Sequence, residues 1–181
     1  MILVVACSDD TAERASANST ASKTPILFLG NQLTIDPAVS PELLFTSLIQ
    51  AQLVREELPF RVNNAGIAGE LLPNTIERWQ VLKALNAQLI IVELPTESGS
   101  ETSYLQVEQL LQMILRDVDI QRVLLWTTPN LGQPLPLQLA ERFKVSIYEI
   151  PIKNTDWEEP ETLQSQIFQQ LWPAIEGKLK D

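Results

Sequence analysis

The sequence contains no histidine among its 181 residues. Histidine is the usual general base near neutral pH, and it is a common ligand of zinc and iron in proteins. Its absence removes the ordinary base of hydrolytic enzymes and most zinc and iron sites. We therefore expect no bound metal and no cofactor.

Positive charge and long apolar runs are also scarce. Lysine and arginine number 13 against 23 aspartates and glutamates, which gives a formal net charge of −10. Nucleic acids and anionic membrane surfaces are bound by basic patches, so we expect no nucleic-acid partner. No apolar run reaches the length of about eighteen residues that a membrane-spanning helix needs.

Cysteine occurs once, as Cys7, so no disulfide can form within the chain. The run from Val4 to Cys7 resembles a bacterial lipobox, although the apolar segment before it is short and lacks a basic residue. We expect residues 1–24 to be a lipobox-like N-terminus and a disordered tether, since residues 8–24 are too polar to form a core. A lipid on Cys7 would anchor the protein in the bacterial cell envelope. The alternative is a frayed N-terminus on a cytoplasmic protein.

Five short apolar runs alternate with segments of helical periodicity after residue 24. The expected strands are 25–29, 60–64, 88–94, 122–127 and 144–150. Five helices are expected. The first begins after Ser40 as its N-cap, the second and third lie near 74–87 and 101–118, and a short fourth starts near Pro136. The last helix ends the chain and is expected to kink at Pro173. This alternation predicts a three-layer α/β/α domain over 25–181, with a parallel sheet of about five strands.

Polar motifs follow the expected strands, at the edge where parallel sheets place their sites. They read GNQLT after the first strand, NNAGIAGE at 63–70, ELPTESG at 93–99 and DWEEP at 156–160. Together, in this order, they resemble the motifs of the SGNH/GDSL hydrolases, especially the bacterial esterase, thioesterase and lysophospholipase branch. The resemblance covers residues 24 to about 180 and implies that family's fold and an ester-hydrolase ancestry.

The resemblance also assigns roles to positions. Gln32 stands where the family has its nucleophilic serine, and Asn31 stands where the preceding aspartate would be. Gly69 matches the glycine that supplies an oxyanion amide, and Glu97 replaces the oxyanion asparagine. Asp156 matches the aspartate of the triad, and Glu159 replaces its histidine.

The replacements remove the family's chemistry. The carboxamide of Gln32 cannot attack an ester, and a carboxylate at Glu97 would repel a developing oxyanion. We therefore predict a catalytically inactive, esterase-like protein. Its inherited cleft would bind a small molecule, an acyl chain or a protein through the six residues Asn31, Gln32, Gly69, Glu97, Asp156 and Glu159.

Three alternatives stay open in the sequence. The first is an active carboxylic-ester or thioester hydrolase whose nucleophile is Ser98, Ser100 or Thr34, with a carboxylate or Lys153 as its base. The second is a pair of carboxylates acting on a sugar, with Trp126 and Trp157 as a stacking surface. The third is a paralogue without function.

The carboxylates also raise the question of a cation. Glu70, Glu97, Asp156 and Glu159 are expected to line one cleft mouth, where bare carboxylates raise one another's pKa. An ion such as Ca²⁺ would relieve their repulsion. A solvated acidic rim is the favoured interpretation, because no recognised calcium-loop spacing is present.

Overall fold

The computed structural model describes residues 23–94, 101–128, 135–152 and 158–180, with the backbone alone at 101–103 and 135–137. Five parallel strands form one sheet in the order β2-β1-β3-β4-β5. The strands are β1 (Thr24–Leu29), β2 (Phe60–Asn64), β3 (Leu89–Glu93), β4 (Val123–Thr127) and β5 (Ser146–Glu149). This order is the flavodoxin-like one, so the predicted parallel α/β fold is confirmed.

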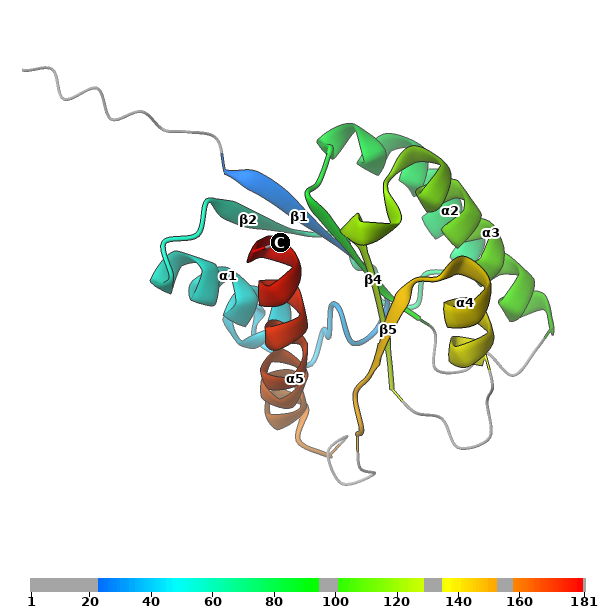
Figure 1. Ribbon diagram of the computed structural model, residues 1–181. Coiled ribbons are helices and arrows are strands. Elements are labelled where there is room, and N and C mark those ends of the chain that lie inside the picture. Colours follow the sequence, from blue (N-terminus) through cyan, green and yellow to red (C-terminus); the bar gives the residue numbers. More distant parts are fainter. Residues whose placement is uncertain (1–22, 95–100, 129–134, 153–157, 181) are drawn as a thin grey trace, which may run out of the picture.

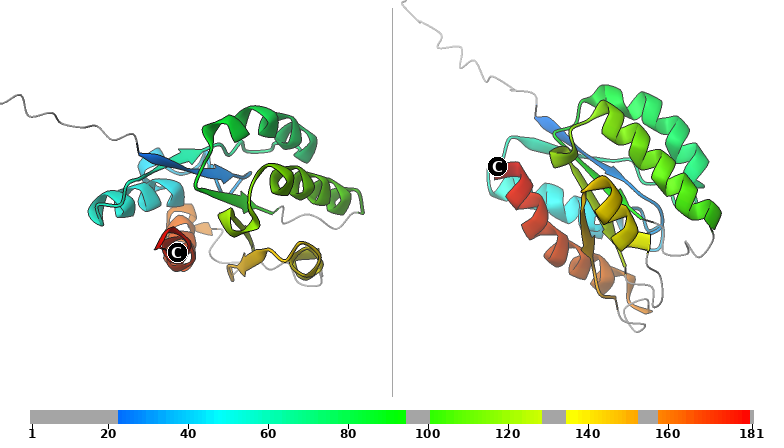
Figure 2. Two further views of the ribbon diagram at one scale, coloured as in Figure 1. Left: turned by 45° about the horizontal axis from the view of Figure 1, so that its top comes forward. Right: turned by 45° about the vertical axis from the view of Figure 1, so that its right-hand side comes forward.

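Helices cover both faces of the sheet (Figures 1 and 2). One face carries α1 (Phe45–Arg55) and α5 (Pro160–Lys180), whose apolar residues share one core cluster. The other face carries α2 (Leu72–Leu82), α3 (Glu101–Asp117) and α4 (Leu135–Phe143), which contribute to a second cluster. Two separate cores on one sheet make the predicted three layers.

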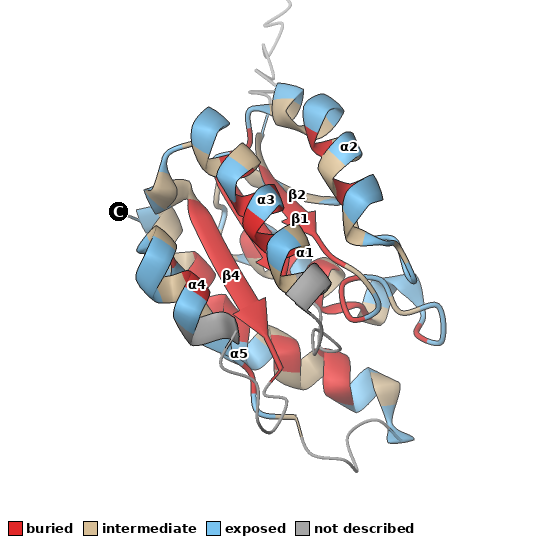
Figure 3. Ribbon diagram, turned by 90° about the vertical axis from the view of Figure 1, so that its right-hand side faces the viewer, coloured by how far each residue is buried: buried red, intermediate tan, exposed pale blue. Residues whose placement is uncertain are grey.

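The central strand β3 and its neighbour β4 are buried along their whole length, and Figure 3 shows β4 in red from end to end. Both of their faces are covered, which explains why their residues are apolar in succession instead of alternating with polar ones. Glu93 is the exception, because a carboxylate ends β3 and is nevertheless buried. A buried carboxylate requires hydrogen bonds, so the partners of Glu93 shape the carboxyl edge of the sheet at the end of β3.

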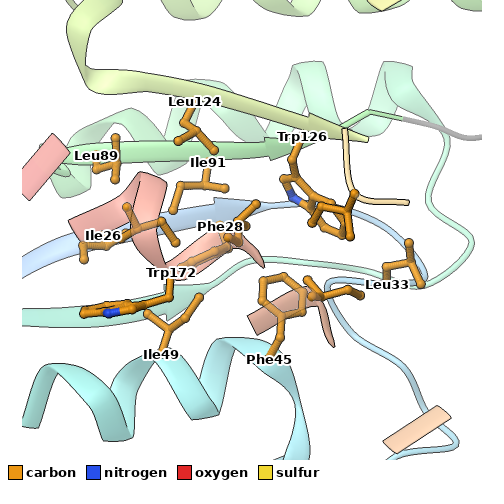
Figure 4. Close-up of a cluster of buried hydrophobic side chains, with 14 of the residues drawn as sticks. Ile26, Phe28, Leu33, Phe45, Ile49, Leu89, Ile91, Leu124, Trp126 and Trp172 are labelled. Atoms are coloured by element: carbon orange, nitrogen blue, oxygen red, sulfur yellow. The ribbon is translucent and has the colours of Figure 1, made fainter. Parts of the chain in front are cut away.

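The core on the α1 and α5 face centres on aromatic side chains (Figure 4). Phe45 packs edge-on against Phe28 and Trp126, with ring centroids 5.7 and 5.4 Å apart. Trp126 is fully buried, so its alternative assignment to an exposed stacking surface is wrong. Its indole projects from β4 and packs against Phe45 of α1. Trp157 lies outside the described residues.

Some element boundaries differ from those expected. Ser40 makes no side-chain capping bond, because a 3₁₀ turn (Pro41–Leu43) intervenes and α1 begins only at Phe45. The helix expected from residue 74 begins at Leu72, with Pro73 in its first turn, where a missing amide hydrogen costs nothing. The last helix extends on both sides of Pro173.

The N-terminal segment 1–22, including Cys7, lies outside the described residues. Among the residues that the structure describes, no helix is both long and apolar enough to cross a membrane.

Candidate functional site at the carboxyl edge

The turn after β1 folds around the carboxylate of Glu93. The backbone amides of Asn31 and Thr34 each donate to Oε2 at 2.8 Å, and the amide of Leu33 donates to Oε1 at 3.2 Å. The Thr34 hydroxyl also donates to Oε2, at 2.5 Å. Four donors from one turn therefore converge on one side chain of the neighbouring strand, which fixes the backbone on both sides of Gln32.

Burial raises the pKa of Glu93 above its ordinary value of 4.5, and the hydrogen bonds from Thr34, Asn31 and Leu33 oppose that rise. The donors are neutral, so no cation compensates the charge of Glu93. Its carboxylate satisfies the turn as an internal anion would, since successive amides form an anion-binding concavity.

Two glycines make this arrangement possible. A β-carbon on Gly30 would lie 1.8 Å from the Thr34 Oγ1 and 2.5 Å from the Glu93 Oε2. A β-carbon on Gly66 would lie 2.7 Å from the Thr34 Cγ2. Because no side chain fits at either position, these glycines let Thr34 sit between the two loops.

Asn31 joins the turn after β1 to the loop after β2. Its Oδ1 accepts a hydrogen bond from the amide of Gly69 at 2.6 Å, and its Nδ2 donates to the carbonyl of Glu70 at 3.0 Å. Gly69 has a φ of 73°, a left-handed conformation that glycine adopts readily. The amide that the resemblance assigns to an oxyanion is therefore engaged by Asn31.

Glu70 forms a bidentate ion pair with Arg78 on α2. Arg78 Nε lies 2.7 Å from Oε1 and Nη2 lies 2.5 Å from Oε2, while the Thr75 hydroxyl donates to Oε2 at 2.9 Å. Arg78 also donates to the carbonyl of Ala65 at 2.9 Å. Glu70 is thus a paired carboxylate that holds the loop, and its expected place among bare carboxylates at a cleft mouth is wrong.

Gln32 and Glu159 are both exposed at the carboxyl edge. Glu159 accepts a hydrogen bond from the Thr162 hydroxyl at 3.0 Å. The two segments approach through the buried Gln164 of α5, whose Nε2 donates to the carbonyl of Leu33 at 3.2 Å. Its Oε1 accepts from the amide of Phe45 at 2.8 Å. The fold therefore brings the start of α5 beside the turn that carries Gln32, without a hydrogen bond between Gln32 and Glu159.

Glu97 and Asp156 lie outside the described residues, as do Ser98, Ser100 and Lys153. The described residues hold no group of three or more histidine, cysteine, aspartate or glutamate side chains that would suit a metal ion.

Thr34, the third hydroxyl considered as a nucleophile, is completely buried. Its hydroxyl is held by Glu93 beneath the turn, so no ester can reach it. The structure excludes Thr34 from that role.

A cavity of about 250 Å³ lies beneath Asn31, between the ends of β1 and β3 and the helices α2 and α3. Its walls are largely apolar, and its polar groups include Asn31, Glu70, Thr75 and Glu93. The apolar part is formed by Leu29, Leu72, Val92 and Leu110. Neither Gln32 nor Gly69 lines it.

The sequence analysis missed both this cavity and the role of Glu93. The available signal was a single acidic residue that ends the otherwise apolar strand LIIVE, since such a residue is buried only with partners.

The strand order, the layers and the polar groups at the carboxyl edge define a three-layer, flavodoxin-like domain with its candidate site at the ends of β1, β2 and β3. When the whole fold is compared with solved structures, it matches those of the SGNH hydrolases. The chain therefore has the SGNH-hydrolase fold.

TesA superposes with a TM-score of 0.68 at 15% sequence identity, over 86% of this chain and 99% of TesA. A phosphonate-inhibited esterase, EstA from Pseudoalteromonas sp., gives a TM-score of 0.69 at 16% identity, over 88% of this chain and all of EstA. AlinE4, an SGNH-hydrolase family esterase, gives 0.56 at 16% identity, over 71% of this chain and 77% of AlinE4. No protein-family model and no curated protein matches the sequence. Identities this low establish the fold alone.

Proposed function

We propose that this chain is a catalytically inactive SGNH-fold protein that binds a small molecule at the carboxyl edge of its sheet. The observation that carries the proposal is the pair of neighbours Asn31 and Gln32. Gln32 offers no nucleophile, and Asn31 Oδ1 accepts from the Gly69 amide at 2.6 Å. An oxyanion would have to displace that hydrogen bond, which works against the preorganisation that catalysis needs.

The cavity beneath Asn31 supports a small ligand with an apolar part, such as an acyl chain. Its apolar wall would bury the chain, while Asn31 and Thr75 offer polar contacts at the side. Ligand sites of this kind combine an apolar lining with a few placed polar groups.

Hydrolysis of short-chain p-nitrophenyl esters tests inactivity. We expect no saturable turnover above a buffer control, because both the nucleophile and the free oxyanion donor are lost. Saturable turnover that Ser98→Ala or Ser100→Ala abolishes would instead establish the active hydrolase with unorthodox residues. The Gln32→Ala variant is the matched control, since it changes the nucleophile position without adding a hydroxyl.

Binding of octanoate, followed by thermal shift, tests the ligand class. We expect a concentration-dependent rise in Tm for the wild type, as linkage requires of a ligand that binds the folded state. Leu72→Trp should abolish the shift by filling the cavity. Val81→Trp is the control, because Val81 lies on the same helix but is 75% exposed. No shift in the wild type, or an equal shift in both variants, would contradict an acyl ligand in this cavity.

We also propose that Cys7 carries a lipid anchor in a bacterial envelope. The position of β1 is compatible with such an anchor, because this strand begins at the edge of the sheet opposite the candidate site (Figure 1). A tether from that edge leaves the site accessible. Protein expressed from the full native gene should partition into detergent, since several acyl chains anchor stably. Cys7→Ser should release it, and equal solubility of both forms would contradict the anchor.

A further inference from the structure

A second cavity, of about 400 Å³, lies at the amino edge of the sheet, remote from the candidate site. It lies between α2 and α3, over Leu27 of β1 and Ile90 of β3. Its floor is apolar and includes the buried residues Leu27, Trp79 and Ile90. Its polar lining includes three cationic side chains and one carboxylate, Lys83, Arg116, Arg122 and Asp117.

The charges at this cavity do not balance. Asp117 is the single carboxylate in its lining, and it lies 3.2 Å from Lys83 and 3.6 Å from Arg116. The four ionisable groups therefore carry a net charge of +2, in a chain whose formal net charge is −10. Asp119 lies nearby in sequence but outside the lining, and it accepts from the Gln121 amide at 2.8 Å.

Arg122 contributes a cation without a carboxylate partner among the described residues. Its guanidinium donates to the carbonyls of Ala87 and Gln88 and to Asn86 Oδ1, all of which are neutral acceptors. These bonds use Nε and Nη2, and none of the described residues accepts a hydrogen bond from Nη1. The backbone orients Arg122 at the cavity and leaves part of its hydrogen-bonding capacity for a ligand.

Trp79 and Asp117 fix the opposite wall. The indole Nε1 of Trp79 donates to Asp117 Oδ2 at 3.1 Å, and this oxygen also receives Lys83. The hydrogen bond from Lys83 is the main reason that the pKa of Asp117 is lowered, with Trp79 contributing. Asp117 thereby holds Lys83 beside the cavity and also lies 3.6 Å from Arg116, so one carboxylate is shared by two cations and the lining keeps its excess of positive charge.

We propose that this cavity binds a phosphate group, with Lys83, Arg116 and Arg122 as its charged ligands. A phosphomonoester carries close to two negative charges at neutral pH, which matches the local excess. Guanidinium groups suit phosphate oxygens because their donors are arranged as a planar fork. The apolar floor would take a small organic part of the ligand.

Two sources supply this chemistry, a free phosphate ester or an anionic lipid headgroup. The lipid source gains support from the position of the cavity. Arg122 donates to the carbonyl of Gln88, and the amide of Gln88 donates to the carbonyl of Pro25 at 2.8 Å. Gln88 therefore connects Arg122 of the cavity to Pro25 near the start of β1. The proposed membrane tether joins the domain at this end of β1.

Titration of the full chain with phenyl phosphate, followed by NMR, tests the site. We expect saturable shifts of the Trp79 indole proton and of amides near residues 83–88 and 116–122, with a dissociation constant on the order of 1 mM. Inorganic phosphate should produce the same pattern more weakly. Acetate and chloride at equal ionic strength should not. No saturable shift, or an equal response to chloride, would overturn the proposal.

The variant Lys83→Gln/Arg116→Gln tests the cationic ligands while keeping the structural bonds of Arg122. Arg116 is suited to substitution because its side chain is 65% exposed. Binding should weaken about tenfold or more, since two charge-assisted contacts are lost. Arg55→Gln, an exposed change on α1, should leave binding unchanged. Equal binding by the double variant and the wild type would contradict the assignment.

Vesicles distinguish the two sources. If the ligand is a lipid headgroup, vesicles of phosphatidylcholine with about one-fifth phosphatidic acid should bind the Cys7→Ser chain at physiological ionic strength, where the Debye length is about 8 Å. Binding should be lost in the double variant. If the ligand is a soluble ester, phenyl phosphate alone binds. Vesicle binding that the double variant retains, without any phenyl phosphate response, would overturn the site.

Discussion

Glu93 and Asp117 are both carboxylates that accept several hydrogen bonds, but they lie at opposite edges of the sheet. Glu93 is buried and receives only neutral donors, three amides and one hydroxyl. Asp117 receives Lys83 and Trp79 at the rim of a cavity with excess positive charge. The described carboxylates Glu93 and Glu70 at the carboxyl edge are each satisfied by neighbouring donors, whereas the cavity at the amino edge carries an excess of positive charge.

Under the proposal that this chain is inactive, the difference explains how the fold can persist without the reaction. The turn after β1 depends on Glu93, Gly30 and Thr34 for its shape, none of which needs to react with a substrate. The exposed side chain at position 32 takes no part in those contacts, so the proposed replacement of a nucleophile there would leave the architecture intact.

Among substitutions at the two edges, Glu93→Ala should lower the free energy of unfolding most. It leaves three amides and a hydroxyl without their acceptor, and we expect the free energy of unfolding to fall by about 3–5 kcal/mol. Urea denaturation measures the change. Glu77→Ala, an exposed change on α2, is the control and should stay within about 0.5 kcal/mol. A loss below about 1 kcal/mol would show that the turn does not depend on Glu93.

Asn31→Ala should cost about 1–2 kcal/mol, because it removes the bonds to Gly69 and Glu70. Its neighbour Gln32 is exposed, so Gln32→Ala should change stability by less than about 0.5 kcal/mol. Chemical denaturation of the two variants side by side separates a residue that holds two loops together from its exposed neighbour. Equal costs would contradict that distinction.

The two carboxylates should give stability a pH dependence of opposite sign. The folded-state pKa of Glu93 is raised above 4.5, so the folded state holds its proton more tightly, and stability should increase as pH falls towards 4.5. The folded-state pKa of Asp117 is lowered below 3.8, so its contribution is present above 3.8 and is lost as pH falls further.

Neutral variants of the two carboxylates show which of them causes each slope of stability against pH. Glu93→Gln should flatten the dependence above pH 4.5, and Asp117→Asn should flatten the dependence below pH 3.8. Melting temperatures across a pH series measure both. If Glu93→Gln left the upper slope unchanged, Glu93 would not be its source.

The sequence predicts the sheet well because its strands are apolar runs that end in polar motifs. It also predicts which loops meet, since parallel strands bring their carboxyl ends to one edge. Local boundaries at Ser40 and Leu72 were missed, because the 3₁₀ turn and the position of Pro73 depend on packing. The same limit explains Trp126, whose burial by Phe45 comes from a distant segment.

The sequence predicts where the candidate site lies in the fold, but it does not predict which residues contact one another there. Asn31, Gln32 and Gly69 were identified from their motifs, yet nothing in the sequence indicates that Asn31 bonds to Gly69 across 38 positions. The sequence analysis treats Glu70 as a free carboxylate because Arg78 comes eight residues later, in the second turn of α2. Such pairings depend on side-chain geometry that only the folded chain defines.

Labelling with a fluorophosphonate, read by mass spectrometry of the intact protein and its peptides, tests the central claim most directly. The wild type should remain unlabelled, with a phosphonate-sensitive esterase as positive control. The triple variant Gln32→Ser, Glu97→Asn, Glu159→His should acquire weak labelling at position 32, since misplacement of about 1 Å can cost on the order of 10²-fold in rate. No single change should suffice, because the catalytic groups act together. Covalent labelling of any serine or threonine in the wild type would contradict the account.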